Sequence, residues 1–111
     1  MSEAEIQAAI RVALGQTPDV LLWRNHVGRV QDERGRWHPF GLAPGSADLV
    51  GLLAPSGRWL ALEVKSDRGA LRPEQRDWLA MVRRAGGFAA VVRSVDEAMA
   101  AVARARAGAS E

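Results

Sequence analysis

The sequence contains no cysteine and no tyrosine, and lysine occurs only at position 65 among fifteen lysine and arginine residues. The absence of cysteine excludes disulfides and thiolate metal sites. It also fits the reducing cytoplasm, where we expect the protein to act. No apolar run approaches the ~18 residues that span a bilayer, so we expect no membrane partner. The first residues lack the basic and apolar regions of a signal peptide.

Length and composition predict one folded domain over residues 1–111. Hydrophobic residues make up 48% of the chain and charged residues 25%, a balance typical of globular proteins. The formal net charge is only +2, so any basic surface has to come from local clusters. Two clusters are present, namely Arg24, Arg29, Arg34 and Arg36, and then Arg68, Arg72 and Arg76. Each is either a phosphate-binding surface or a solvated one.

Apolar periodicity and turn signals predict an α/β domain in which helices flank a mixed β-sheet. The expected elements are a helix over 3–14, a strand over 20–27, an irregular hairpin within 28–45, strands over 47–54 and 58–65, a helix over 73–85, a strand over 88–93 and a helix from 94 to about 107. Ser2 and Glu5 form a capping box at the first helix, and the irregular hairpin turns near Gly35. The order is α-β-β-β-α-β-α without that hairpin, and residues 108–111 are expected to be frayed.

The two strands around the turn at 54–57 predict a polar cluster. A turn centred between positions 55 and 56 pairs residues whose numbers sum to 111, so Asp48 lies opposite Glu63 on one face. Lys65 shares that face because it follows two residues later. Opposed carboxylates repel each other unless one takes up a proton or a cation lies between them, and Mg²⁺ suits such ligands. The pattern predicts either a catalytic metal site or a surface Glu–Lys pair with Asp48 closing a turn.

Glu3 is a candidate fourth member of this cluster. In a helix over 3–14 it lies near the apolar face that carries Ile6 and Ile10. It is either an outer metal ligand, reached through a water molecule, or a carboxylate that stabilises the helix N-terminus.

The order and spacing of these residues resemble those of a known family. Gly45-Ser46-Ala47-Asp48, followed after fourteen residues by Glu63-Val64-Lys65, is similar to the PD-(D/E)xK nuclease signature. Further matches to the virus-type replication-repair nuclease (VRR-NUC) domain are Glu3-x-x-Ile6-Gln7, Trp23-Arg24-Asn25 with Gly28, Gly51, Gln75 and Gly86-Gly87. One departure is Ala47, where the signature prefers Pro. Because that Pro is not a ligand, we expect activity to be retained.

The resemblance implies a restriction-endonuclease-like fold and phosphodiester hydrolysis with Mg²⁺, for which Mn²⁺ substitutes. It implies that Asp48, Glu63 and the backbone carbonyl of Val64 bind the metal and that Lys65 positions or activates water. It also implies that Glu3 and Gln75 support the site, with Glu3 acting on the metal through water.

The resemblance further implies a structure-selective DNA endonuclease for branched or Holliday-junction-like DNA. Such an enzyme would act as a homodimer in replication, recombination or repair, in a bacterial or phage-infected cell. We expect DNA contacts from Arg24, Asn25, Arg29, Arg34, Arg36, Trp37, Arg68 and Arg72. Trp37 either stacks on an unpaired base or closes the rim of the core. The alternatives are a nucleic-acid-binding module without catalysis and a subunit of a phage replication or packaging machine.

Overall fold

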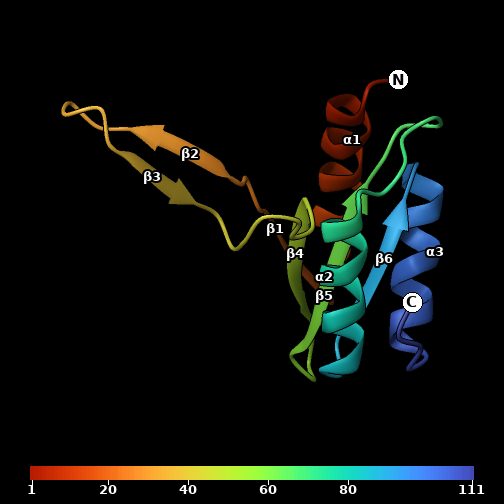
Figure 1. The fold of residues 1–111 in the computed structure, drawn as a ribbon. Coiled ribbons are helices and arrows are strands. Elements are labelled where there is room, and N and C mark those ends of the chain that lie inside the picture. Colours follow the sequence, from red (N-terminus) through yellow and green to blue (C-terminus); the bar gives the residue numbers. More distant parts are fainter.

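A four-stranded sheet forms the centre of the computed structural model, which describes all residues from 1 to 111 (Figure 1). Its strands lie in the order β1, β4, β5, β6, and a separate two-stranded sheet pairs β2 with β3. The elements are α1 (Glu3–Gly15), β1 (Val20–Arg24), β2 (Gly28–Gln31), β3 (Trp37–Phe40), β4 (Leu49–Leu53), β5 (Arg58–Val64), α2 (Pro73–Arg84), β6 (Phe88–Val92) and α3 (Val95–Arg106). Strand β6 runs parallel to β5 while the other pairs are antiparallel, so the sheet is mixed.

Alternating side chains on the strands divide the core into two layers. Leu60 and Leu62 of β5 face one side, where they join Ile10 of α1 and Val102 of α3 in the larger cluster. Ala61 of β5 faces the other side and packs with α2 in the smaller cluster. The sheet is therefore sandwiched between α1 and α3 on one face and α2 on the other. This arrangement confirms the predicted α/β class and is compatible with a restriction-endonuclease-like core.

Short polar signals set the ends of the helices. The backbone N–H of Glu5 donates to Ser2 Oγ at 3.2 Å, and the N–H of Ser2 donates to Glu5 Oε1 at 3.0 Å, which confirms the first capping box. At the start of α3, Ser94 Oγ accepts from the N–H of Glu97 at 3.1 Å. None of the three helices has the length and apolarity that crossing a bilayer requires.

The β4–β5 hairpin has the register that the sequence predicts. Leu49 lies opposite Leu62 and Val50 lies opposite Ala61, so paired residue numbers sum to 111. The residues next in line beyond this ladder are Asp48 and Glu63. Because a shift of one residue would send their side chains to opposite faces, this register is what brings the two carboxylates together.

Residues 28–40 form an arm that projects from the body of the protein, as Figure 1 shows. Its strands pair only with each other, from Gly28 opposite Phe40 to Gln31 opposite Trp37. Strand β1 ends at Arg24 and not at the predicted residue 27, because the chain leaves the main sheet there to enter the arm.

The C-terminal residues are held against the body, although the sequence predicts that they are frayed. The N–H of Ala89 donates to the carbonyl of Ser110 at 3.0 Å. The carboxylate of Glu111 also lies 3.2 Å from Arg83 Nη2. These contacts join residues more than twenty positions apart, which is why local composition did not reveal them.

Candidate active site

Asp48, Glu63 and Lys65 gather where β4 begins and β5 ends, on the face of the sheet that α2 covers. Asp48 directly precedes β4, and its Oδ2 accepts a hydrogen bond from the backbone N–H of Val64 at 2.8 Å. Lys65 Nζ lies 3.8 Å from Glu63 Oε1, and both side chains are buried. The predicted convergence of the two carboxylates and the ammonium is therefore present.

The carboxyl of Glu63 is the most perturbed group of the site. Only 2% of the residue is exposed, and Glu63 Oε2 is a buried oxygen without any hydrogen-bond partner. Burial in the first place, and then the nearby charge of Asp48, raise the pKa of Glu63 to about 8, while Lys65 opposes this effect. A buried acceptor without a donor is costly, so a proton, a cation or a water molecule at this oxygen would stabilise the folded chain.

Gln75 fixes the other oxygen of Glu63. Its Nε2 donates to Glu63 Oε1 at 3.2 Å, and its own Oε1 accepts from the backbone N–H of Arg72 at 3.0 Å. Because Gln75 lies in the first turn of α2 and is itself buried, it ties the carboxylate to the start of this helix. The implied supporting role of Gln75 has a direct structural basis.

Asn25 holds the segment that leads to Asp48. Its Nδ2 donates to Ser46 Oγ and to the carbonyl of Ala47, both at 2.8 Å. Its Oδ1 accepts from the N–H of Leu42 at 3.2 Å, and its backbone N–H donates to the carbonyl of Asp48 at 2.7 Å. The Asn25 side chain uses both of its N–H donors and its oxygen acceptor inside the protein. In this structure Asn25 therefore positions the segment that carries Asp48, whereas the sequence led us to expect that Asn25 contacts DNA.

Gly45 lets the same segment pass close to α2. Its φ of +83° lies in the left-handed region that favours glycine. A Cβ atom there would lie 2.6 Å from the carbonyl oxygen of Glu74. Glycine is therefore required both by the backbone conformation and by the close approach of the helix.

Arg93 was not identified from the sequence. Its Nη1 donates to the carbonyls of Ser66 and Gly69, at 2.5 and 2.8 Å, and so holds the loop that follows Lys65. No local pattern could have indicated this role, since the partners lie at least 24 positions away in the chain.

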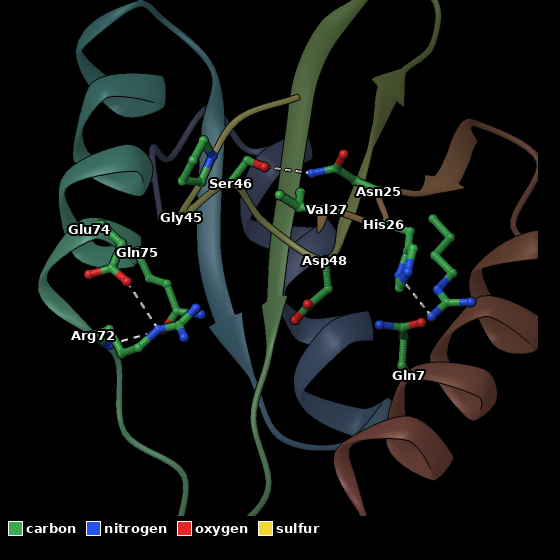
Figure 2. Close-up of a pocket in the computed structure, with 12 residues that line it drawn as sticks. Gln7, Asn25, His26, Val27, Gly45, Ser46, Asp48, Arg72, Glu74 and Gln75 are labelled. Carbon is green, nitrogen blue, oxygen red and sulfur yellow. Dashed lines mark hydrogen bonds and ion pairs between the residues drawn. The ribbon is translucent and has the colours of Figure 1, made fainter. Parts of the chain in front are cut away.

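A polar cleft of about 420 Å³ opens beside Asp48. Figure 2 shows Asp48 between Gln7 of α1 on one side and, on the other, Gln75 of α2 and Arg72, which directly precedes that helix. Of the twelve residues that line the cleft, one is hydrophobic, so the space suits a charged or strongly polar ligand. Gln7 lines this cleft, although the sequence analysis assigned it no role beyond its place in the Glu3-x-x-Ile6-Gln7 match.

The predicted basic residues fall into two groups. Arg24 and Arg72 line the cleft, and the exposed Arg68 lies in the loop after Lys65. The other predicted DNA contacts lie on the arm, namely Arg29, Arg34, Arg36 and Trp37. Of all these residues, only Arg24 and Arg72 line the cleft together with Asp48.

Glu3 is exposed at the start of α1, where it adds a minor charge effect to the raised pKa of Glu63. No group of three or more His, Cys, Asp and Glu side chains is arranged to hold a metal. Glu3 is thus not a third direct ligand beside Asp48 and Glu63. The lone Oε2 of Glu63 and the neighbouring Asp48 carboxylate nevertheless fit a hard divalent cation, because Mg²⁺ typically takes one or two carboxylates and keeps several waters.

Comparison with known proteins identifies the family of the chain. The model of the VRR-NUC domain family matches residues 35–96, a segment that contains Asp48, Glu63, Lys65 and Gln75. A search of curated proteins found no match. Because the matched segment covers more than half of the chain and contains the clustered carboxylates and lysine, the protein belongs to the VRR-NUC domain family of nucleases.

Proposed function

We propose that this nuclease hydrolyses DNA phosphodiester bonds in a reaction that requires Mg²⁺, with Mn²⁺ as a substitute. The observation that carries the proposal is the buried Glu63 Oε2, which has no hydrogen-bond partner and lies beside the Asp48 carboxylate. Keeping two carboxylates this close in a buried place destabilises the folded chain unless a proton or a cation offsets their charge. Such an arrangement is expected where a cation is bound for catalysis.

Three groups would hold the cation, namely the carboxylates of Asp48 and Glu63 and the backbone carbonyl of Val64. When bound, the cation would neutralise phosphate charge and lower the pKa of a coordinated water. Gln75 keeps the Glu63 carboxylate in one orientation, and the backbone N–H of Val64 does the same for Asp48. Glu3 is not grouped with Asp48 and Glu63 as a third ligand, so any contribution from it would pass through water.

Lys65 would orient the attacking water or offset charge in the transition state. Its Nζ lies 3.8 Å from Glu63 Oε1 and only 8% of the residue is exposed, so the ammonium is confined beside the carboxylates. Arg24 and Arg72 border the polar cleft and would hold the phosphates on either side of the scissile bond.

We also propose that the substrate is branched DNA and that two copies act together in replication, recombination or repair. Each chain has one cleft with the carboxylates at its edge, and two copies related by a two-fold axis would present one cleft to each of two strands. Light scattering of the purified protein would give the mass of a dimer. A monomer at micromolar concentration would contradict this part of the proposal alone.

Cleavage of labelled single strands, duplexes, flaps and four-way junctions tests the activity. Wild-type protein should cut in Mg²⁺ or Mn²⁺ and not in EDTA, and Lys65→Ala should lower the single-turnover rate by at least about 100-fold. Arg84→Ala is the matched control, because it removes the same charge from an exposed residue in the last turn of α2.

Two other functional classes give different results in this experiment. Salt-sensitive DNA binding without metal-dependent cleavage would indicate a nucleic-acid-binding module. The absence of both binding and cleavage would favour a subunit of a larger machine. Cleavage by Lys65→Ala at the wild-type rate would show that the activity comes from another site.

A further inference from the structure

The turn at the tip of the arm of residues 28–40 is held by several hydrogen bonds, although the arm makes no pairing with the main sheet. Asp32 Oδ1 accepts from the backbone N–H groups of Arg34 and Arg36 at 2.9 Å each. Asp32 Oδ2 accepts from Arg36 Nε at 2.9 Å and lies 2.8 Å from His38 Nε2. One carboxylate thus organises the whole turn, and the arm is held in shape before any partner binds.

The chain segments that lead into and out of the arm both line the polar cleft beside Asp48. His26 and Val27, which lead into β2, line the cleft, and so do Gly45 and Ser46, which follow the end of the arm. At the root of the arm, the ring of His26 stacks on that of Phe40 with centroids 5.3 Å apart. The root of the arm therefore borders the cleft, and DNA bound in the cleft would lie next to it.

Trp37 is a large aromatic residue exposed on the arm. It is 57% exposed, and the guanidinium of Arg29 lies 5.3 Å from the centre of its ring. This exposure excludes the rim of the hydrophobic core, which was the other sequence-based interpretation. Trp37 begins β3, so it lies about 10 Å along the strand from Phe40 at the root, a distance that a few nucleotides span.

Stacking on a base explains these features better than an apolar protein contact does. Phe40, Val30 and His38 share one face of the arm, while Trp37 lies on the other face with Gln31, Arg29 and Pro39. The face that carries Trp37 is not an apolar stripe, because Gln31 and Arg29 lie beside the ring. An exposed aromatic ring with arginine beside it is the arrangement that binds single-stranded nucleic acid without sequence preference.

We propose that the arm binds an unpaired DNA strand beside the catalytic cleft, with Trp37 stacking on a base and Arg34 contacting the backbone phosphates. The inference rests on the proposed nuclease function and adds the feature that recognises the substrate. In a continuous duplex the faces of the bases are covered by their neighbours, so Trp37 can stack only where strands separate. Branch selectivity would then come from the arm, while hydrolysis comes from Asp48, Glu63 and Lys65.

Binding of fluorescent DNA in metal-free buffer tests this role, with two flap substrates that carry either normal or abasic residues in the unpaired strand. Trp37→Ala should weaken binding to the normal flap by at least about fivefold. The wild type should bind the abasic flap more weakly than the normal flap by a similar factor. Trp37→Ala should bind the abasic flap with nearly the same affinity as the wild type does, because the stacking contact is already lost. Trp37→Phe should retain part of the affinity, which also guards against loss of the fold.

Salt dependence separates stacking from phosphate contact. Trp37→Ala should leave the slope of log affinity against log salt unchanged, whereas Arg34→Gln should reduce it. Val30→Ala is the matched control, since Val30 is equally exposed at 57% but lies on the opposite face of the arm. It should bind both flaps as the wild type does.

Several results would overturn the inference. The first is that Trp37→Ala binds the normal flap with wild-type affinity. The second is that Trp37→Ala loses as much affinity for the abasic flap as for the normal flap. The third is that Val30→Ala loses as much affinity as Trp37→Ala. A change from dimer to monomer in Trp37→Ala would show that the arm joins two copies. If the wild type cuts DNA in a metal-dependent reaction but binds the normal and abasic flaps equally, only the proposed role of the arm is refuted. If it cuts no DNA, the nuclease proposal itself is refuted.

Discussion

Replacing Glu63 by Gln tests the electrostatics of the site, because it removes one charge and keeps the shape of the side chain. Burial, and then the neighbouring Asp48, raise the pKa of Glu63 from its ordinary 4.5 to about 8. The folded chain therefore holds this proton more tightly than the unfolded chain does. The stability that comes from Glu63 is complete below about pH 4.5 and is lost as the pH rises to 8.

The size of the effect follows from the two pKa values. Between pH 5 and pH 8, metal-free wild type should lose about 3 kcal/mol of unfolding free energy relative to Glu63→Gln, at about 1.4 kcal/mol per pH unit. At about 4 °C per kcal/mol for a domain of this size, the Tm of the wild type should fall about 12 °C further than that of the variant. Saturating Mg²⁺ should remove most of the difference at pH 8, because it stabilises only the folded wild type.

Thermal melts by circular dichroism at pH 5, 6.5 and 8, in EDTA and in Mg²⁺, measure this directly. Glu33→Gln is the control, since its carboxylate is exposed in the turn of the arm and makes no hydrogen bond or ion pair. It should follow the wild type at each pH. Parallel melting curves for wild type and Glu63→Gln over the whole range would refute the buried, unpartnered state of Glu63.

Three further substitutions probe the groups around Glu63. Asp48→Asn should raise the Tm in EDTA at pH 8 and above, where Glu63 becomes charged and is repelled by Asp48. This gain should vanish in Mg²⁺, and equal shifts in both buffers would argue against a shared cation. Gln75→Leu should lower stability by about 2 kcal/mol at pH 8 and less at pH 5, because it removes the donor to a charged, buried carboxylate; a pH-independent loss in thermal melts would contradict that role. Asn25→Asp replaces the amide NH2 group, which donates to Ser46 Oγ and to the carbonyl of Ala47, by one carboxylate oxygen that cannot donate. It should destabilise the protein by about 2 kcal/mol and also weaken Mg²⁺ binding in calorimetry; a stability change with unaltered metal affinity would make Asn25 merely structural.

The register of the β4–β5 hairpin could be predicted because one local feature determines it. A short turn fixes which residues face each other, and the two-residue period of a strand fixes which side they face. From these two rules, Asp48, Glu63 and Lys65 had to meet. Gln75 needed the family resemblance, since its place on α2 relative to β5 depends on packing between distant segments.

The parts that sequence reasoning missed depend on contacts between distant segments. The hydrogen bonds of Asn25, the residue that follows β1, reach the segment before Asp48, 22 positions later. Arg93 reaches back 24 positions to the loop after Lys65. Glu3 lies near the buried side of its helix by periodicity, but the packing of α1 on the opposite face of the sheet leaves it exposed. Periodicity describes one element and not its distance from another.

Proton release on metal binding tests most directly whether Asp48 and Glu63 hold the cation. Titration calorimetry with Mg²⁺ at pH 7, in buffers of different ionisation enthalpy, gives the number of protons released. The wild type should release close to one proton per ion, because a carboxyl with a pKa of about 8 is mostly protonated at pH 7 and must lose that proton to bind metal. Glu63→Gln should bind Mg²⁺ more weakly and release none. Binding to the wild type without proton release, or equal affinity in the variant, would contradict the assignment of the metal site.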